Sequence, residues 1–164
     1  MPRLVSCLIL LLALLAPPAL AQDVRVTFGQ SLRLDGSALE VTADSLTVDQ
    51  TTGASEFSGN VLAVQGGMRI SAASLRLEYD RVAQSGGQRI GRVIASGGVL
   101  MATPDEAIEA REAVYSLTNQ TLEMTGSVML VQGANMLSGE RFFADLRAGT
   151  GSMQGRVRTV IRLD

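Results

Sequence analysis

The side chains that most often carry out chemistry are scarce in this sequence. It contains no histidine, its basic residues are all arginine, and its single cysteine is Cys7. The lack of histidine removes the commonest general base and the commonest zinc ligand. The 16 Asp and Glu residues can still act as acids and bases, but no pair of them stands apart from ordinary surface acids. We therefore predict no catalytic site, no metal site and no cofactor, and a protein that is not an enzyme.

Arginines form a regular polar pattern near the carboxyl end. Arg156, Arg158 and Arg162 share one face of an alternating segment. This face is either a solvated strand face that discourages edge pairing or a contact surface for lipid phosphates. The formal net charge of −2 and the few aromatic side chains argue against nucleic acid as a partner.

The first residues have the features of a secretion signal. Arg3 is followed by an apolar run from Leu4 to Ala16, which is shorter than the roughly 20 residues of a membrane span, and small residues flank Leu20. We expect residues 1–21 to be a signal peptide cleaved after Ala21. Residues 22–164 then form one domain without cysteine, in an exported, periplasmic protein.

Two interleaved signatures divide the chain into repeats. In the first, a glycine precedes a valine by two positions, at Gly59, Gly97, Gly126 and Gly155, with spacings of 38, 29 and 29. In the second, a small residue precedes a larger or apolar one by three positions, at Ala43, Ala72, Ala110 and Gly139, with spacings of 29, 38 and 29. Nine additional residues fall between Tyr79 and Val93, where residues 84–88 have the composition of an exposed loop. A fixed period of this kind indicates stacked structural units.

Apolar residues alternate within each repeat, which is typical of β-strands. The alternation slips by one position after each small residue, so each long strand is expected to bend there through a corner or bulge. Aligned repeats give stacked positions that either pack as a core or line an apolar channel. These positions are Val41, Ile70, Ile108 and Leu137; Leu46, Leu75, Ala113 and Phe142; and Val61, Val99, Val128 and Val157.

One segment, residues 104–114, has a competing helical signal. Thr103 to Glu106 resembles a capping box with proline in the first turn. The repeat instead places Ile108 and Ala110 at strand positions. Because tertiary context overrides weak propensity, we predict a strand.

The two ends of the predicted strand stack carry no proline that would block pairing. Residues 24–28 and the arginine-bearing carboxyl end both read as strands. Open edges of this kind allow head-to-tail self-association or addition of a partner strand.

Several of these elements resemble the LptA/OstA family of periplasmic lipopolysaccharide transport proteins. The resemblance lies in residues 43–49, in 57–61 with Val64-Gln65-Gly66, in 70–72 and in 75–79. It implies an all-β, open, twisted jelly-roll with no substantial helix over residues 22–164. It also implies a carrier that binds the acyl chains of lipid A and passes lipopolysaccharide from the inner-membrane transporter to the outer-membrane translocon. Implied partners are the OstA-like domains anchored at the inner membrane and located at the outer membrane, joined by edge-strand addition.

Carried onto this chain, the resemblance implies that the inward positions form the lipid groove. The candidate ligand-binding residues are Val41, Leu46, Phe57, Val61, Ile70, Leu75, Val99, Ile108, Met124, Val128, Leu137 and Phe142. A structural repeat protein that polymerises through its edges without a ligand remains an alternative, as does a closed solenoid in place of the open jelly-roll. An enzyme on a β-solenoid would be expected to show clustered acids or a lysine or histidine beside a groove.

Overall fold

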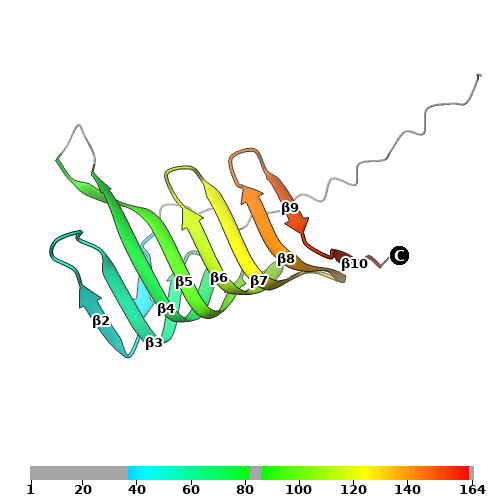
Figure 1. The fold of residues 1–164 in the computed structure, drawn as a ribbon, viewed down its shortest axis with the longest axis horizontal. Coiled ribbons are helices and arrows are strands. Elements are labelled where there is room, and N and C mark those ends of the chain that lie inside the picture. The colour runs from blue at the N-terminus through cyan, green and yellow to red at the C-terminus, as the bar shows by residue number, and fades with distance from the viewer. Residues whose placement is uncertain (1–36, 82–85, 163–164) are drawn as a thin grey trace, which may run out of the picture.

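The chain folds into one antiparallel β-sheet with open edges. The structure is a computed structural model that describes residues 37–81 and 86–162. The signal peptide and the strand predicted at residues 24–28 lie outside these residues. The strands succeed one another along the long axis of the molecule (Figure 1) and are β1 (Glu40–Thr42), β2 (Ser45–Val48), β3 (Ser55–Gln65), β4 (Met68–Arg81), β5 (Gln88–Ala102), β6 (Glu106–Ser116), β7 (Thr121–Gln132), β8 (Asn135–Asp145), β9 (Thr150–Gln154) and β10 (Arg158–Val160).

From β3 to β8, each strand pairs with its neighbours in sequence. The path runs from β3 to β8, β1 and β2 both pair with β3, and β9 and β10 both pair with β8. The described residues contain no helix, and the two end strand pairs do not meet each other. This confirms the all-β, open architecture and excludes a closed solenoid.

The long strands bend at the glycine signature. Gly97 and Gly98 in β5 have φ angles of 83° and 86°, and Gly126 and Ser127 in β7 have 86° and 56°. At both sites the pairing register shifts, because two residues on the bent strand lie opposite one on its neighbour. Left-handed backbone is cheap for glycine, and such a bulge bends the strand, so the glycine explains this part of the repeat.

The residue that follows each small residue of the second signature lies directly across from a bend. A Cβ atom on Gly97 would lie 2.5 Å from the Cβ of Ala73 in β4, and one on Gly126 would lie 2.8 Å from the Cβ of Arg111. The same close approach joins Gly155 and Glu140. The predicted bends are therefore present, with the extra residue on the glycine-bearing strand.

Alanine at Gly97 is expected to destabilise the protein more than alanine at Gly98. Both substitutions impose left-handed strain of about 1–2 kcal/mol, but only the Cβ at Gly97 meets another atom, whereas nothing lies within 4 Å of one at Gly98. The collision should lower the free energy of unfolding of Gly97→Ala by about 1–3 kcal/mol more than that of Gly98→Ala, as measured by urea denaturation. Ala73→Gly in the Gly97→Ala background should recover this excess. Equal losses at the two glycines would show that strain alone fixes the bend.

The bends fold the sheet into a trough with two facing layers. Layer A consists of β1, β10 and residues 61–65, 68–72, 99–102, 106–110, 128–132 and 135–139. Layer B consists of β2, β9 and residues 55–58, 74–81, 88–96, 112–116, 121–125 and 141–145. Side chains from both layers belong to one buried apolar cluster, so the core lies between the layers.

The segment with the helical signal is a strand, as predicted. The side chain of Thr103 accepts hydrogen bonds from the backbone N–H groups of Asp105 and Glu106, at 3.4 and 3.2 Å. This local pattern shapes the turn before β6, after which Ile108 and Ala110 are buried in the core. The polar residues that favour a helix start here serve a turn instead.

The nine additional residues mainly lengthen one hairpin. Strand β4 continues to Arg81, which pairs with Gln88 at the start of β5. Residues 84 and 85 of the predicted loop lie outside the described residues. Within this extension Thr118 of the neighbouring turn donates a hydrogen bond to Asp80 at 2.5 Å. The β4–β5 hairpin therefore reaches beyond the adjacent strands of layer B.

Candidate functional site

The inner face of the trough carries continuous rows of side chains, one row on each layer. In layer B, successive register partners run from the first strand to the last: Leu46, Phe57, Leu75, Ala95, Ala113, Met124, Phe142 and Met153. In layer A the corresponding row is Val41, Ala63, Ile70, Met101, Ile108, Leu130, Leu137 and Thr159. Both rows are apolar along nearly their whole length and reach both edges of the sheet.

The predicted groove residues all lie on this inner face. Val41, Ile70, Ile108 and Leu137 belong to the layer A row, and Leu46, Phe57, Leu75, Met124 and Phe142 belong to the layer B row. The remaining three, Val61, Val99 and Val128, follow the bends and pair with the small residues Ala72, Ala110 and Gly139.

The interior is solid over most of its length. Met124 and Phe142 are fully buried, and Val128 is 1 % exposed, so these side chains pack against protein. Leu46 is 55 % exposed because its strand, β2, lies at the open edge. The predicted positions therefore divide into packed core and an exposed end.

A cavity of about 170 Å³ separates the layers toward the amino-terminal edge. Its walls come from both layers, from the segment before β1 and from the turn after β6. They are Ser37, Leu39, Ala63, Gln65, Met68, Ile70, Leu75, Ile90, Val93, Tyr115 and Leu117. An apolar cavity of about 150 Å³ holds benzene, so this space accepts about six carbon atoms.

Only Ile70 and Leu75 of the predicted residues line this cavity. Ala63 lies two positions along β3 from the predicted Val61, and Tyr115 lies two positions along β6 from Ala113, a stacked position of the repeat, so strand alternation could have found both. Val93 is the register partner of Tyr115 on β5. Leu39 and Leu117 lie outside the strands, where no periodic signal exists. Sequence reasoning missed them for that reason.

Three polar residues line the cavity: Gln65 at the end of β3, Ser37 and Tyr115. The side-chain nitrogen Nε2 of Gln65 donates a hydrogen bond of 2.7 Å to the carbonyl oxygen of Ser37. The side-chain oxygen Oε1 of Gln65 is buried and has no hydrogen-bond partner among the described residues. The hydrogen bond ties the segment before β1 to the end of β3 at the cavity wall.

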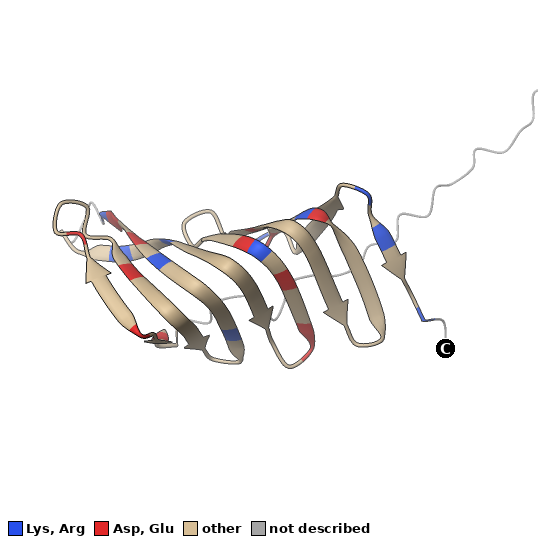
Figure 2. Cartoon of the chain, turned by 60° about the horizontal axis from the view of Figure 1, so that its bottom comes forward, with Lys and Arg blue, Asp and Glu red and all other residues tan. Residues whose placement is uncertain are grey.

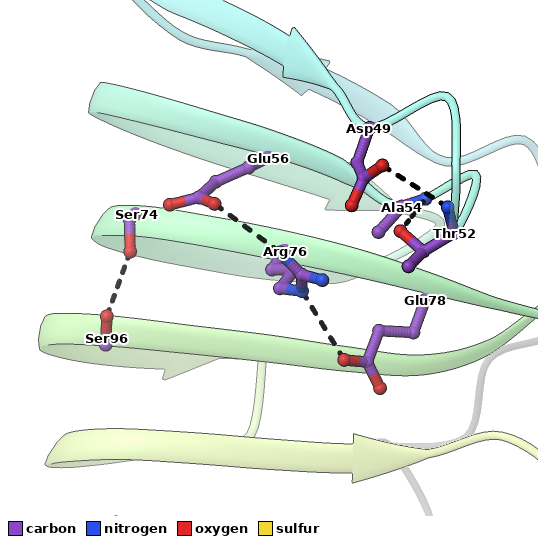
Figure 3. Close-up of polar contacts among 8 residues, drawn as sticks. All are labelled: Asp49, Thr52, Ala54, Glu56, Ser74, Arg76, Glu78 and Ser96. Atoms are coloured by element: carbon purple, nitrogen blue, oxygen red, sulfur yellow. Dashed lines mark hydrogen bonds and ion pairs between the residues drawn. The ribbon is translucent and has the colours of Figure 1, made fainter.

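The outer face of layer B is polar and salt-bridged. Arg76 lies between Glu56 and Glu78, at 3.6 and 3.4 Å, and a hydrogen bond of 2.9 Å joins Ser74 to Ser96 (Figure 3). Exposed ion pairs of this kind contribute little stability each, but they keep this face solvated. The amphiphilic sheet therefore directs apolar binding to the inside of the trough.

A tight turn closes the β2–β3 hairpin on this face. The carboxylate of Asp49 accepts hydrogen bonds from the backbone N–H groups of Thr51 and Thr52, at 2.8 and 3.3 Å. These hydrogen bonds, with the Thr51 backbone contributing most, lower the pKa of Asp49 from its usual value. Asp49 has a structural role in holding the turn.

The two open edges differ in charge and share exposed apolar side chains. At the amino edge, Glu40 begins β1 and Asp44 follows it, while Leu46 and Val48 are about half exposed. At the carboxyl edge, Arg156, Arg158 and Arg162 lie beside the exposed Val157, Val160 and Ile161. Figure 2 shows basic residues along the last strand segment and acidic residues near the opposite end of the sheet. The edges are complementary in sign.

Within residues 37–81 and 86–162, no group of three or more His, Cys, Asp or Glu side chains is placed to hold a metal ion. In that same part of the chain no helix is long and apolar enough to cross a membrane.

These features define an elongated, open-edged antiparallel β-protein with an apolar interior. Residues 40–150 match the family described as LptA/(LptD N-terminal domain) LPS transport protein, and the chain belongs to this family. It is also 28 % identical over 160 residues to an uncharacterized protein of Rhizobium meliloti (strain 1021), covering 93 % of this chain and 84 % of that protein.

A solved structure shares the fold. The crystal structure of LptH, the LptA-homologous periplasmic component of the lipopolysaccharide transport device of Pseudomonas aeruginosa, superposes with a TM-score of 0.66. The match covers 77 % of this chain and 96 % of LptH at 19 % identity. The predicted family and its fold are thereby confirmed.

Proposed function

We propose that this protein is a periplasmic carrier that shelters the acyl chains of lipopolysaccharide on their way from the inner-membrane transporter to the outer-membrane translocon. Membership of a lipopolysaccharide transport family supports this role. The likeness to LptH, a periplasmic component, supports the location. In this proposal residues 1–21 are the signal that exports the chain, and residues 22–164 form the carrier.

The observation that carries the proposal is the apolar interior that runs from edge to edge and is hollow at one end. Leaving a methylene in water costs about 0.8 kcal/mol, so a lipid with several acyl chains needs continuous apolar shelter to cross an aqueous space. The inner rows offer such shelter, beginning at the cavity beside Ile70. The predicted groove residues are proposed to contact acyl chains.

Lipid movement past the solid part of the trough requires the layers to separate. Phe142 and Met124 fill the space between the layers near the carboxyl edge. Because the sheet is open, the layers can move apart without breaking strand pairs at the edges. The cavity near the amino edge is then the part that is already open to a chain.

The experiment that tests the carrier role is equilibrium binding of purified residues 22–164 to fluorescent lipopolysaccharide. We expect saturable binding that unlabelled lipopolysaccharide competes away. A folded protein that binds no lipopolysaccharide would leave the second candidate, a structural β-repeat protein that polymerises through its edges. The solid core around Phe142 is the observation that favours this alternative.

The edges are proposed to join copies of this chain head to tail, and to join it to the OstA-like domains at the two membranes. The chain passes from layer A to layer B between β1 and β2, and from layer B to layer A between β9 and β10. When the two edges lie side by side with like layers together, their strands are therefore antiparallel. Within the sheet, Gly126 and Ser127 face Glu140 between two register points. If the junction between two copies keeps this register, Arg156 of one copy lies opposite Asp44 of the next.

Charge reversal at this junction should block self-association. Arg156→Glu and Asp44→Arg are each expected to stay monomeric at concentrations where the wild type assembles, because like charges oppose at the junction. An equimolar mixture of the two variants should assemble again in alternating order, because both kinds of junction then pair opposite charges, and sedimentation velocity measures this. Assembly of either single variant at wild-type concentrations would contradict the proposed register.

A further inference from the structure

We propose that the outer face of layer A is a docking surface for a second copy of this chain, packed face to face about a two-fold axis at Leu100. This face is separate from the edges that are proposed to join copies head to tail, and the inference does not depend on the carrier role. The observation behind it is a pattern of outward side chains on layer A that is apolar and complementary to itself.

The two outer faces of the trough differ in polarity. The outer face of layer B carries ion pairs such as those that join Arg76 to Glu56 and Arg141 to Glu123, at 3.6 and 2.9 Å. The outward side chains of layer A form two rows across the strands: Thr42, Leu62, Ser71, Leu100, Glu109, Met129, Ser138 and Arg158 nearer the bends, and Glu40, Val64, Arg69, Ala102, Ala107, Val131, Met136 and Val160 nearer the lip. An antiparallel sheet that packs its core on one face usually presents polar side chains on the other, so this apolar outer face indicates a contact surface.

Large apolar side chains on this face are exposed. Leu62 is 38 % exposed and Leu100 is 39 % exposed. The described strands all belong to one sheet, and the buried cluster lies on the other side of layer A, so no described element covers these side chains. Leu62, Ser71 and Leu100 also border an open hollow that is lined by Gly97 and Gly98. A side chain from a docked partner can enter this hollow, because the two glycines leave it unfilled.

The apolar side chains are arranged symmetrically about β5. Strand β3 lies two strands from β5 on one side, and β7 lies two strands from it on the other. In the row nearer the bends, β3 carries Leu62, β5 carries Leu100 and β7 carries Met129. A two-fold axis between the faces, parallel to β5 and passing over Leu100, therefore brings Leu62 opposite Met129 of the second copy. In the row nearer the lip, the same axis brings Val64 opposite Val131.

The two charged residues at the centre of the face have opposite signs and lie at equal distances from this axis. Arg69 lies on β4 and Glu109 lies on β6, one strand to each side of β5. The axis places Arg69 one row from Glu109 of the second copy, within reach of long side chains across sheets that pack about 10 Å apart. The contact occurs twice in each dimer. This charge complementarity favours a second copy over other occupants of the face.

The face-to-face contact adds no backbone hydrogen bonds, so it is weaker than strand addition at the edges, and crosslinking is the way to trap it. Residues 22–164 contain no cysteine, which allows a single thiol to be introduced as Leu100→Cys. The protein also carries Arg156→Glu, which keeps the edges from joining copies. We expect a short bismaleimide to give crosslinked dimers whose yield rises with protein concentration. The matched control is Arg92→Cys, exposed on the outer face of layer B on the same strand, which should give only the yield of random collisions.

A charge swap tests the arrangement of the two copies in the same Arg156→Glu background. Arg69→Glu should weaken dimerisation about tenfold, because two attractive contacts become repulsive. Adding Glu109→Arg should restore it, since the swapped charges are again opposite across the axis. Sedimentation equilibrium measures both, at protein concentrations above those that assemble the wild type through its edges. Equal crosslinking at positions 100 and 92, or a swap that fails to restore dimerisation, would overturn the inference. Dimers that form only after residues 22–36 are removed would also overturn it, because that segment would then be the occupant of the face.

Discussion

Replacement of Phe142 by alanine is expected to lower the free energy of unfolding by about 3–5 kcal/mol. The ring is fully buried in the layer B row, between Met124 and Met153. Its removal leaves a cavity that the flanking strands cannot collapse to fill, because they are held in register on both sides. Urea denaturation followed by circular dichroism measures the loss.

The matched control is Phe143→Ala, the next residue on the same strand. Phe143 points to the outer face and is only half-buried, opposite Glu123 and Ser152. We expect it to cost about 1 kcal/mol, as is usual for positions outside the core. Similar losses at the two phenylalanines would contradict the assignment of inner and outer faces on which the carrier role depends.

Phenylalanine in place of Ala63 is expected to weaken lipopolysaccharide binding by about a hundredfold, because about three to four methylenes lose shelter worth about 0.8 kcal/mol each. Ala63 is 2 % exposed and lines the cavity. A phenyl ring occupies the space that benzene fills in cavities of this size, so it should exclude an acyl chain. Binding is measured with fluorescent lipopolysaccharide.

Leu62→Phe provides the control, since Leu62 is the preceding residue and lies on the outer face, 38 % exposed. It should leave binding unchanged. Thermal unfolding of both variants near the wild-type temperature would show that the new ring at position 63 is accommodated by the cavity. Undiminished binding by a folded Ala63→Phe protein would mean that the acyl chains lie elsewhere.

The repeat made much of the fold predictable from the sequence. Gly97 has a left-handed backbone and lies close to Ala73, so the bend requires glycine at this position. The recurring glycines therefore reveal the bends in the sequence. The stacked apolar positions follow from the same period. The strand at β6 was predictable only because the repeat outweighed the local helical signal.

The cavity was not predictable in the same way. Whether an apolar row packs tightly or leaves a space depends on side-chain volumes facing each other across the two layers, which alternation does not record. Leu117 and Leu39 reach the cavity from outside the strands, and Gln65 reads as an ordinary polar residue at a turn. The sequence placed residues on the inner face but could not tell which of them border open space.

The central claim is that acyl chains bind inside the trough, and photo-crosslinking tests it most directly. p-Azidophenylalanine, whose side chain is close in size to tyrosine, replaces Tyr115, which lines the cavity, or Phe143 on the outer face, in protein produced in a lipopolysaccharide-containing host. After irradiation, we predict a lipopolysaccharide adduct at position 115 and none at position 143. An adduct at position 143 alone, or no adduct at either position in folded protein, would contradict an acyl-binding interior.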